Sequence, residues 1–151
     1  MAFLGTSKVT LDSKGRFAVP TRYRPLIAAE AMESSEGKPG RIPMMITRGR
    51  KRELWLLTNA NWEILYAGVS QLSVGDAFRR RIELNAEPVE VDGNGRLLIP
   101  AGLREKGLLP NATLAFMGAG KHFEIWDWDE HLRDEEEEQA KAEASAANFN
   151  F

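Results

Sequence analysis

The chain has 151 residues, of which 43% are hydrophobic and 28% charged, proportions typical of a folded globular protein rather than a disordered one. It contains no cysteine, which excludes disulfides, thiolate metal sites and cysteine nucleophiles. The longest uncharged stretch, residues 107–120, is too short for a membrane-spanning helix, and the first residues lack a signal-peptide pattern. We therefore expect a cytoplasmic protein without a membrane partner.

The net charge of −2 conceals an uneven distribution. Residues 1–126 contain 18 basic and 13 acidic side chains, whereas residues 127–151 contain 2 basic and 9 acidic ones. A basic body suits a polyanionic partner. The acidic end is equally consistent with a solvated terminal helix.

Two segments, residues 11–24 and 91–104, repeat each other at a constant offset of 80. Their identical positions are an Asp, a Gly, an Arg, a Pro and a second Arg. Glu53-Leu54-Trp55 similarly matches Glu124-Ile125-Trp126, at an offset of 71. We interpret the chain as two copies of one unit, the first carrying nine extra residues as a loop insertion within residues 34–52, where Gly and Pro are frequent.

The first copy begins with an expected strand over Thr6–Leu11. Asp12 followed three residues later by Gly15 is typical of a type I turn, because Asp accepts hydrogen bonds from turn amides and Gly tolerates a positive φ. Arg16–Val19 predicts a second short strand, after which Pro20 suits the first position of a helix.

The segment between the copies has helical periodicity. Thr58 or Asn59 is expected to cap a first helix, Gly75 to interrupt it and Asp76 to cap a second. The apolar positions of the first helix are Trp62, Leu65, Val69 and Leu72, and those of the second are Phe78 and Ile82.

The second copy follows the same order. Strands over Glu87–Val91 and Arg96–Ile99 flank a turn from Asp92 to Gly95, and a helix over Pro100–Lys106 stops at Gly107. The later strands of the two copies are expected at Glu53–Leu57 and His122–Trp126.

The last segment begins with Asp127 and Glu130, which resemble a capping box. They predict a Glu- and Ala-rich helix that frays before Phe151.

The sequence carries no recognisable catalytic motif. His122 and His131 are the only histidines and lack a metal-ligand spacing. Gly118-Ala119-Gly120 lacks the further Gly or Lys of a nucleotide-binding loop. We expect no enzyme activity, no cofactor and no metal, with His122 a half-buried structural residue.

Basic residues instead gather around the repeated turns. Arg at a protruding turn can bind guanine through two hydrogen bonds, and Lys can neutralise phosphate. The residues expected to contact DNA are Lys14, Arg16, Arg22, Arg24, Arg96 and Arg104. Each motif arginine also follows an Asp by four residues, so Asp12–Arg16 and Asp92–Arg96 ion pairs are a second, compatible role.

Two further basic runs have open roles. Residues 41–52 contain five basic and no acidic side chains, and three consecutive arginines occupy residues 79–81. The arginines at 79–81 form either a solvated helix face or phosphate contacts. One of them can also pair with Glu83 or with the acidic tail.

At these motifs the sequence resembles the MraZ family of bacterial transcription regulators. The resemblance covers about residues 1–135 and is carried by Phe3-Leu4-Gly5, by Leu-Asp-Ser-Lys-Gly-Arg from Leu11 and by Val-Asp-Gly-Asn-Gly-Arg-Leu-Leu-Ile-Pro from Val91. Asp12, Arg16, Asp92 and Arg96 occupy the family's motif positions.

The resemblance implies a mainly β fold with flanking helices (α+β), in which two AbrB-like swapped-hairpin repeats form a small β-barrel in one chain. The expected divisions are repeat 1 at 5–57, a helical linker at 58–85, repeat 2 at 86–126 and an acidic C-terminal helix and tail at 127–151.

It also implies a nucleoid-associated DNA-binding protein that forms closed homo-oligomeric rings. Such a protein represses its own cell-division and cell-wall operon by binding short G-rich direct repeats in double-stranded promoter DNA. The alternative is an antitoxin-like AbrB module that neutralises a partner protein, with Asp127–Glu138 as its surface.

Overall fold

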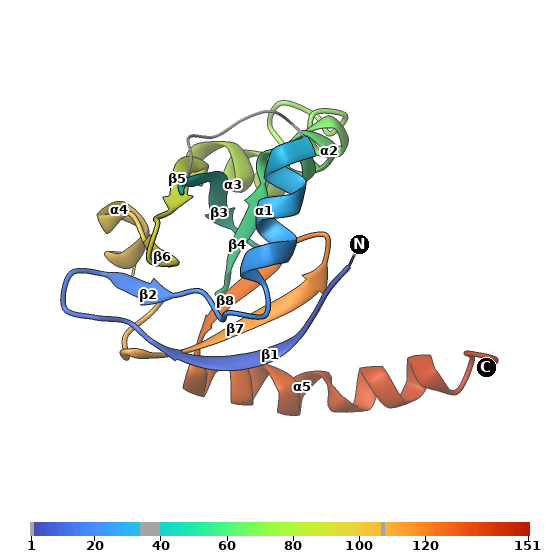
Figure 1. The fold of residues 1–151 in the computed structure, drawn as a ribbon. Helices are drawn as coiled ribbons and strands as arrows, with labels where there is room; N and C mark the ends of the chain where they lie inside the picture. Colours follow the sequence, from blue (N-terminus) through green and yellow to red (C-terminus); the bar gives the residue numbers. More distant parts are fainter. Residues whose placement is uncertain (1, 34–39, 107) are drawn as a thin grey trace.

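The computed structural model describes residues 2–33, 40–106 and 108–151 and is drawn in Figure 1. Within these ranges the chain forms eight strands in one sheet and five helices. The strands are β1 (Phe3–Thr10), β2 (Arg16–Ala18), β3 (Ile42–Arg48), β4 (Leu54–Thr58), β5 (Glu87–Val91), β6 (Arg96–Leu98), β7 (Thr113–Gly120) and β8 (Phe123–Asp127). The helices are α1 (Arg24–Glu33), α2 (Asn59–Val69), α3 (Ala77–Asn85), α4 (Ala101–Arg104) and α5 (Trp128–Ala146). In the described ranges, no helix is both long and apolar enough to cross a bilayer.

The sheet interleaves the two copies. Its order is β1-β7-β8-β4-β3-β5-β6-β2, and every ladder is antiparallel. The first strand of each copy pairs with a later strand of the other, since β1 lies along β7 and β5 along β3. The remaining crossed ladders join β4 to β8 and β2 to β6. The two repeats therefore form one mainly β near-barrel with helices around it, which confirms the expected fold class.

Aromatic rings fill the barrel. The rings of Phe3 and Phe123 are stacked with centroids 4.3 Å apart, and Phe116 stacks on Phe123 at 4.8 Å. Phe17 from β2 joins them, so strands from both copies contribute to one core. Tyr23 is buried beside these rings and its hydroxyl donates to the carbonyl of Leu4 at 2.5 Å.

A second, smaller core lies outside the barrel under α2 and α3. Residues of β4 alternate between the two faces of the sheet. Leu54 and Leu56 face the barrel, whereas Trp55 and Leu57 pack with Val69 and Ile82 from the helices. Trp62, Leu65 and Phe78 pack against this cluster, so the predicted apolar helix faces are largely used within the chain.

The predicted helix caps are confirmed. Thr58, Asp76 and Asp127 each precede a helix, and their side chains accept hydrogen bonds from the amides of Asn61, Arg79 and Glu130. The first linker helix ends at Val69 rather than reaching Leu72, and α5 ends at Ala146, before Phe151.

The predicted loop insertion within residues 34–52 is wrong in its later part. Ile42–Arg48 is strand β3, which pairs with both β4 and β5. Pro43 lies opposite Glu90 in the β5 ladder but precedes the β4 pairing, which begins at Met44, so it has a paired strand on one side only. The nine extra residues lie before β3, since residues 19–41 separate β2 from β3 and residues 99–112 separate β6 from β7. Residues 34–39 of the predicted insertion lie outside the described residues.

The two prolines after the short strands behave differently from each other. Pro100 is the N-cap of α4, which begins at Ala101, one position after the predicted start, and ends at Arg104, two positions before the predicted end. After Pro20 the chain first makes a turn, in which the Tyr23 amide donates to the Pro20 carbonyl, and α1 begins only at Arg24. The predicted stop at Gly107 lies outside the described residues.

Gly118→Ala tests the close approach of β1 to β7. Gly118 faces Gly5 in that ladder, and a β-carbon there would collide with the backbone of Phe3 and Leu4. We expect the substitution to lower the free energy of unfolding by about 1–3 kcal/mol, because the backbone of β1 must shift. Urea unfolding followed by circular dichroism at one protein concentration measures the change.

Gly68→Ala is the matched control, since nothing lies within 4 Å of a β-carbon at this position in α2. It is expected to raise the free energy of unfolding by up to about 1 kcal/mol, through helix propensity. Unchanged stability of the Gly118→Ala protein would contradict the β1–β7 packing.

Candidate nucleic-acid interface

The two repeated turns have the same hydrogen bonds. In the first, the Gly15 amide donates to the Asp12 carbonyl at 3.0 Å, and Asp12 Oδ1 accepts from the amides of Lys14 and Arg16, both at 2.9 Å. In the second, the corresponding distances to Asp92 are 2.9 Å, 2.9 Å and 3.0 Å. The fourth residue of each turn is a glycine with a φ of +85° or +77°. The turns expected from the Asp-x-x-Gly pattern are confirmed.

The arginines that follow the turns differ in how tightly their Asp holds them. Arg16 Nε donates to Asp12 Oδ2 at 3.1 Å, whereas Arg96 Nε lies 4.0 Å from Asp92 Oδ2. Arg96 Nε is also buried without a hydrogen-bond partner among the described residues. The predicted ion pairs are present, and the one in the first turn also has a hydrogen bond. Among the described residues the terminal nitrogens of Arg16 have no protein partner, so they remain available to a ligand.

Both turn carboxyls are held in the ionised form. The backbone N–H of Arg16 is the main cause that lowers the pKa of Asp12, and the backbone N–H of Arg96 is the main cause for Asp92. The charge of each carboxylate also attracts the guanidinium beside it. Each Asp therefore has two effects: it accepts the backbone hydrogen bonds that fix its turn, and its charge attracts the arginine that follows.

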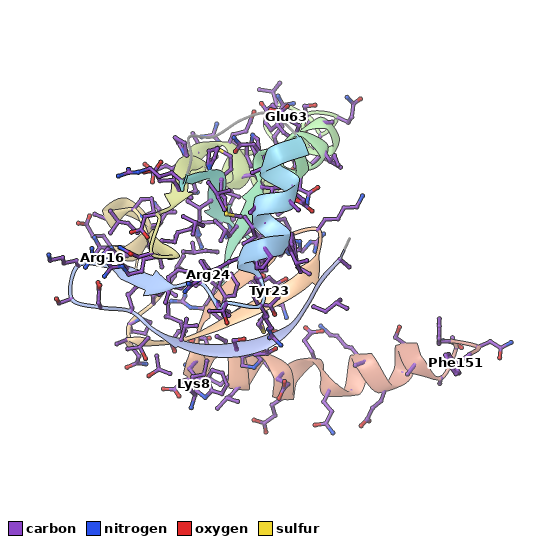
Figure 2. The ribbon with its side chains drawn as sticks, in the orientation of Figure 1. Lys8, Arg16, Tyr23, Arg24, Glu63 and Phe151 are labelled. Atoms are coloured by element: carbon purple, nitrogen blue, oxygen red, sulfur yellow. The ribbon has the colours of Figure 1, made fainter. Side chains whose placement is uncertain are left out.

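The turns lie side by side because β2 and β6 pair with each other. Phe17 lies opposite Leu97 in this ladder. Beyond it, the Val19 amide donates to the Gly95 carbonyl at 2.8 Å, and the Ile99 amide donates to the Gly15 carbonyl at 2.9 Å. Figure 2 shows Arg16 at the end of the β1–β2 turn, close to β6 and α4. The structure thus brings together Lys14, Arg16 and Arg96, three of the residues expected to contact DNA.

Arg24 and Arg104 lie behind the turns rather than at their tips. Arg24 Nε donates to the Val19 carbonyl at 2.8 Å, and Arg104 Nε donates to the Ile99 carbonyl at 2.9 Å. Arg22 lies in the turn before α1 and donates to Ser7 Oγ of β1 at 2.9 Å. Its guanidinium also lies 4.6 Å from the Tyr23 ring centroid.

Two of the basic residues of 41–52, Lys51 and Arg52, contact the acidic helix α5, whereas Arg41 pairs with Glu90 of β5. Lys51 Nζ contacts both Asp134 Oδ1 and Glu138 Oε1 at 2.5 Å, and the hydrogen bond to Asp134 is the main cause that raises the pKa of Lys51. Arg52 Nε lies 3.9 Å from Glu130. The sequence shows that residues 41–52 are basic and residues 127–151 acidic, but it gives no sign that the two segments contact each other.

The three arginines at 79–81 differ in their partners, because they point to different sides of α3. Arg79 pairs with Glu83 at 3.2 Å and donates to the carbonyls of Ser70 and Leu72, which confirms the expected partner. Arg81 donates to backbone carbonyls of the β3–β4 loop. Arg80 is exposed.

His122 occupies a half-buried structural position, as expected. Its Nε2 lies 3.2 Å from Glu124 Oε2, and its ring centroid lies 4.6 Å from that of Trp55. Burial raises the pKa of Glu124, but hydrogen bonds from His122 and Trp126 outweigh it and lower the pKa. In the part of the chain that the structure describes, no three acidic, His or Cys side chains are grouped as metal ligands.

Asp12→Asn tests the contribution of the ionised carboxylate to the first turn. At pH 7 we expect it to lower the free energy of unfolding, because it removes the charge that holds Arg16. The pKa of Asp12 is lowered on folding, so its contribution is complete above the unfolded pKa near 3.8 and is lost as pH falls through the folded value. The gap between parent and variant should therefore narrow below about pH 3.8.

Urea unfolding between pH 7 and pH 2.5 measures this gap. Glu136→Gln, which removes a negative charge from the exposed part of α5, is the charge control. A gap that is absent at pH 7, or constant at every pH, would count against the role of Asp12.

The comparisons with known proteins agree with this geometry. A family model described as "MraZ protein, putative antitoxin-like" matches the chain twice, at residues 2–85 and 82–150. The chain is 37% identical over 134 residues to "Transcriptional regulator MraZ" of Paraburkholderia phytofirmans, covering 88% of this chain and 87% of that protein. Its namesake in Legionella pneumophila is 36% identical over 130 residues, covering 83% of this chain and 79% of that protein. With two copies of the family unit along its length, the chain belongs to the MraZ family of transcriptional regulators, not to a family of enzymes.

Proposed function

We propose that this regulator represses transcription by binding specific DNA sequences with the turns at residues 12–16 and 92–96. The observation that carries the proposal is the pair of matching turns, set side by side, each ending in an arginine. The Nε of Arg16 donates to Asp12, and its two terminal nitrogens have no hydrogen-bond partner among the described residues, so they can act as a planar fork. That fork matches the O6 and N7 acceptors of guanine in the major groove.

The first turn is proposed to dominate recognition. Lys14 in the first turn corresponds to Asn94 in the second, so the first turn carries one more positive charge. Arg16 is also the more firmly oriented of the two arginines. We assign base recognition to Arg16, phosphate contacts to Lys14 and Arg22, and a weaker contact to Arg96.

The target is proposed to be short G-rich direct repeats in the promoter of the protein's own cell-division and cell-wall operon. The motif resemblance supports this assignment, and guanine is the base that the Arg16 fork fits. A repressor of this kind acts on the nucleoid.

Assembly into a closed ring is part of the proposal. Trp62, Leu65 and Val69, the apolar residues of the first linker helix, pack largely within the chain. Large apolar side chains are nevertheless exposed on the linker at Ile64, Leu72, Val74 and Leu84. Exposed apolar side chains of this kind suit a contact between neighbouring copies, and a heterologous contact repeated around an axis forms a ring when its rotation closes.

The antitoxin-like alternative is supported by the wording of the family description alone. Its candidate surface, Asp127–Glu138, already contacts the chain's own basic loop through Glu130, Asp134 and Glu138. A gel shift of the labelled promoter by pure protein supports DNA binding. The absence of a shift, with a toxin-like reading frame beside the gene, supports the alternative.

Arg16→Ala should weaken binding by about 1–3 kcal/mol per engaged repeat and relax the preference for guanine. Lys14→Ala should weaken binding to all sequences alike and reduce the slope of log K against log salt by about one unit. Fluorescence anisotropy over a salt series, with guanine-substituted operators, measures both effects.

Arg96→Ala is the matched control at the equivalent position of the second turn. Its effect on affinity should be smaller than that of Arg16→Ala. Loss of binding by Arg96→Ala, with affinity and specificity intact in a folded Arg16→Ala protein, would overturn the assignment to the first turn.

A ring should bind an array of repeats far more tightly than a single repeat. Once one subunit is bound, later contacts are effectively intramolecular, which can raise avidity by about 10²–10⁴-fold. Repeats spaced by about 10 base pairs place successive sites on one face of the duplex. Light scattering after size exclusion should give a mass several times 16.9 kDa, and anisotropy should rank three repeats well above one. A monomer at micromolar concentration would contradict the ring, and equal affinity for one and three repeats would contradict the avidity.

A further inference from the structure

The arginines after β2 and β6 each contact the turn of the other copy. A β-carbon built at Gly15 would lie 2.5 Å from Arg104 Cζ, so the Arg104 guanidinium lies directly against the first turn. A β-carbon at Gly95 would likewise collide with Arg24 Cζ. The contact is therefore crossed, from copy 2 to the first turn and from copy 1 to the second.

Each arginine is fixed where it makes this contact. Arg104 donates from Nε to the Ile99 carbonyl, and the Ile99 amide in turn donates to the Gly15 carbonyl. Arg24 donates to the Val19 carbonyl, and the Val19 amide donates to the Gly95 carbonyl. The residue just after β6, Ile99, thus donates to the carbonyl of Gly15 and accepts from Arg104, whose guanidinium covers Gly15, and Val19 does the same for Gly95 and Arg24.

Glycine is required in the turns for two physical reasons. Gly15 and Gly95 have positive φ, which other residues rarely adopt, and the space of their β-carbons is filled by a guanidinium. The second arginine of the repeated motif and the glycine of the opposite copy therefore form one structural unit.

We propose that Arg104 positions the first turn and Arg24 the second, so that each DNA-reading turn is held by the other copy. This inference rests on the proposed role of the turns in reading DNA. Gly15 is covalently joined to Arg16, so a shift of Gly15 moves the Arg16 amide that Asp12 holds and the fork that Asp12 orients. Paired hydrogen bonds to one base tolerate little displacement, because hydrogen bonds weaken steeply with distance and angle.

Hydrogen exchange of the full chain without DNA tests the crossed contact. Arg104→Gln should speed exchange in peptides spanning residues 11–18 and leave residues 91–98 unchanged. Arg24→Gln should do the reverse, and each variant is the matched control for the other. Faster exchange in the variant's own turn, or equally throughout the chain, would overturn the proposal.

Double-mutant cycles of DNA affinity test positioning against direct contact. Arg104→Gln should couple to Arg16→Ala by about threefold or more and combine additively with Arg96→Ala, whereas Arg24→Gln should couple to Arg96→Ala. Additive behaviour of all four pairs would overturn the positioning role.

Lysine variants distinguish positioning of the turn from a direct contact to phosphate, because a phosphate contact needs only the positive charge. Arg104→Lys retains the charge but loses the planar fork that covers Gly15, so it should restore neither exchange protection nor affinity. Full rescue by Lys would overturn the proposal in favour of a phosphate contact. If each variant speeds exchange in the turn of the other copy but DNA affinity is unchanged, the contact between copies is supported and the proposed role of the turns in binding DNA is overturned.

Discussion

Two backbone hydrogen bonds join the repeated turns to each other's copies. The Val19 amide of the first copy donates to Gly95 in the second turn, and the Ile99 amide of the second copy donates to Gly15 in the first turn. They extend the short β2–β6 ladder, which has three residue pairs and would be marginal by itself. The long β1–β7 and β3–β5 ladders cross between copies in the same way. Each copy therefore supplies strands that the other pairs with, and Phe17 of the first copy packs against Phe116 of the second in one shared core.

This interleaving also determines the shape of the candidate DNA surface. Two turns with their own Asp-centred hydrogen bonds would be independent loops if the copies folded separately. Because β2 and β6 pair, the two turns lie side by side at one edge of the barrel, with Arg16 and Arg96 as the first residues of the paired strands. Two turns held together by strand pairing are better suited to a groove of fixed dimensions than two independent loops are.

The uneven charge of the chain is partly compensated within the molecule. Helix α5 extends along the underside of the sheet in Figure 1, and its acidic residues pair with Lys51 and Arg52 of the β3–β4 loop. Lys8 also lies 4.4 Å from the Trp128 ring at the start of this helix. Lys51 and Arg52 of the loop pair with carboxylates of a separate helix, whereas the Asp of each turn contacts its arginine through Nε, so the turn cations are the better candidates for a polyanionic partner. Exposed ion pairs of this kind contribute little stability each, so their main effect is on where positive charge remains available.

The sequence by itself determined the local structure: the duplicated turns, the caps at Thr58, Asp76 and Asp127, and the linker helices, because each depends on side chains within a few residues. It also identified the family and the residues of the turns. Strand β3 was missed because Pro43 and the nearby glycines look like loop punctuation, whereas its pairing with β4 and β5 depends on segments far along the chain. The positions of Arg24 and Arg104 against the opposite turns, and the pairing of Lys51 with α5, were likewise decided only by the tertiary structure, since local sequence cannot specify which distant segment a side chain meets.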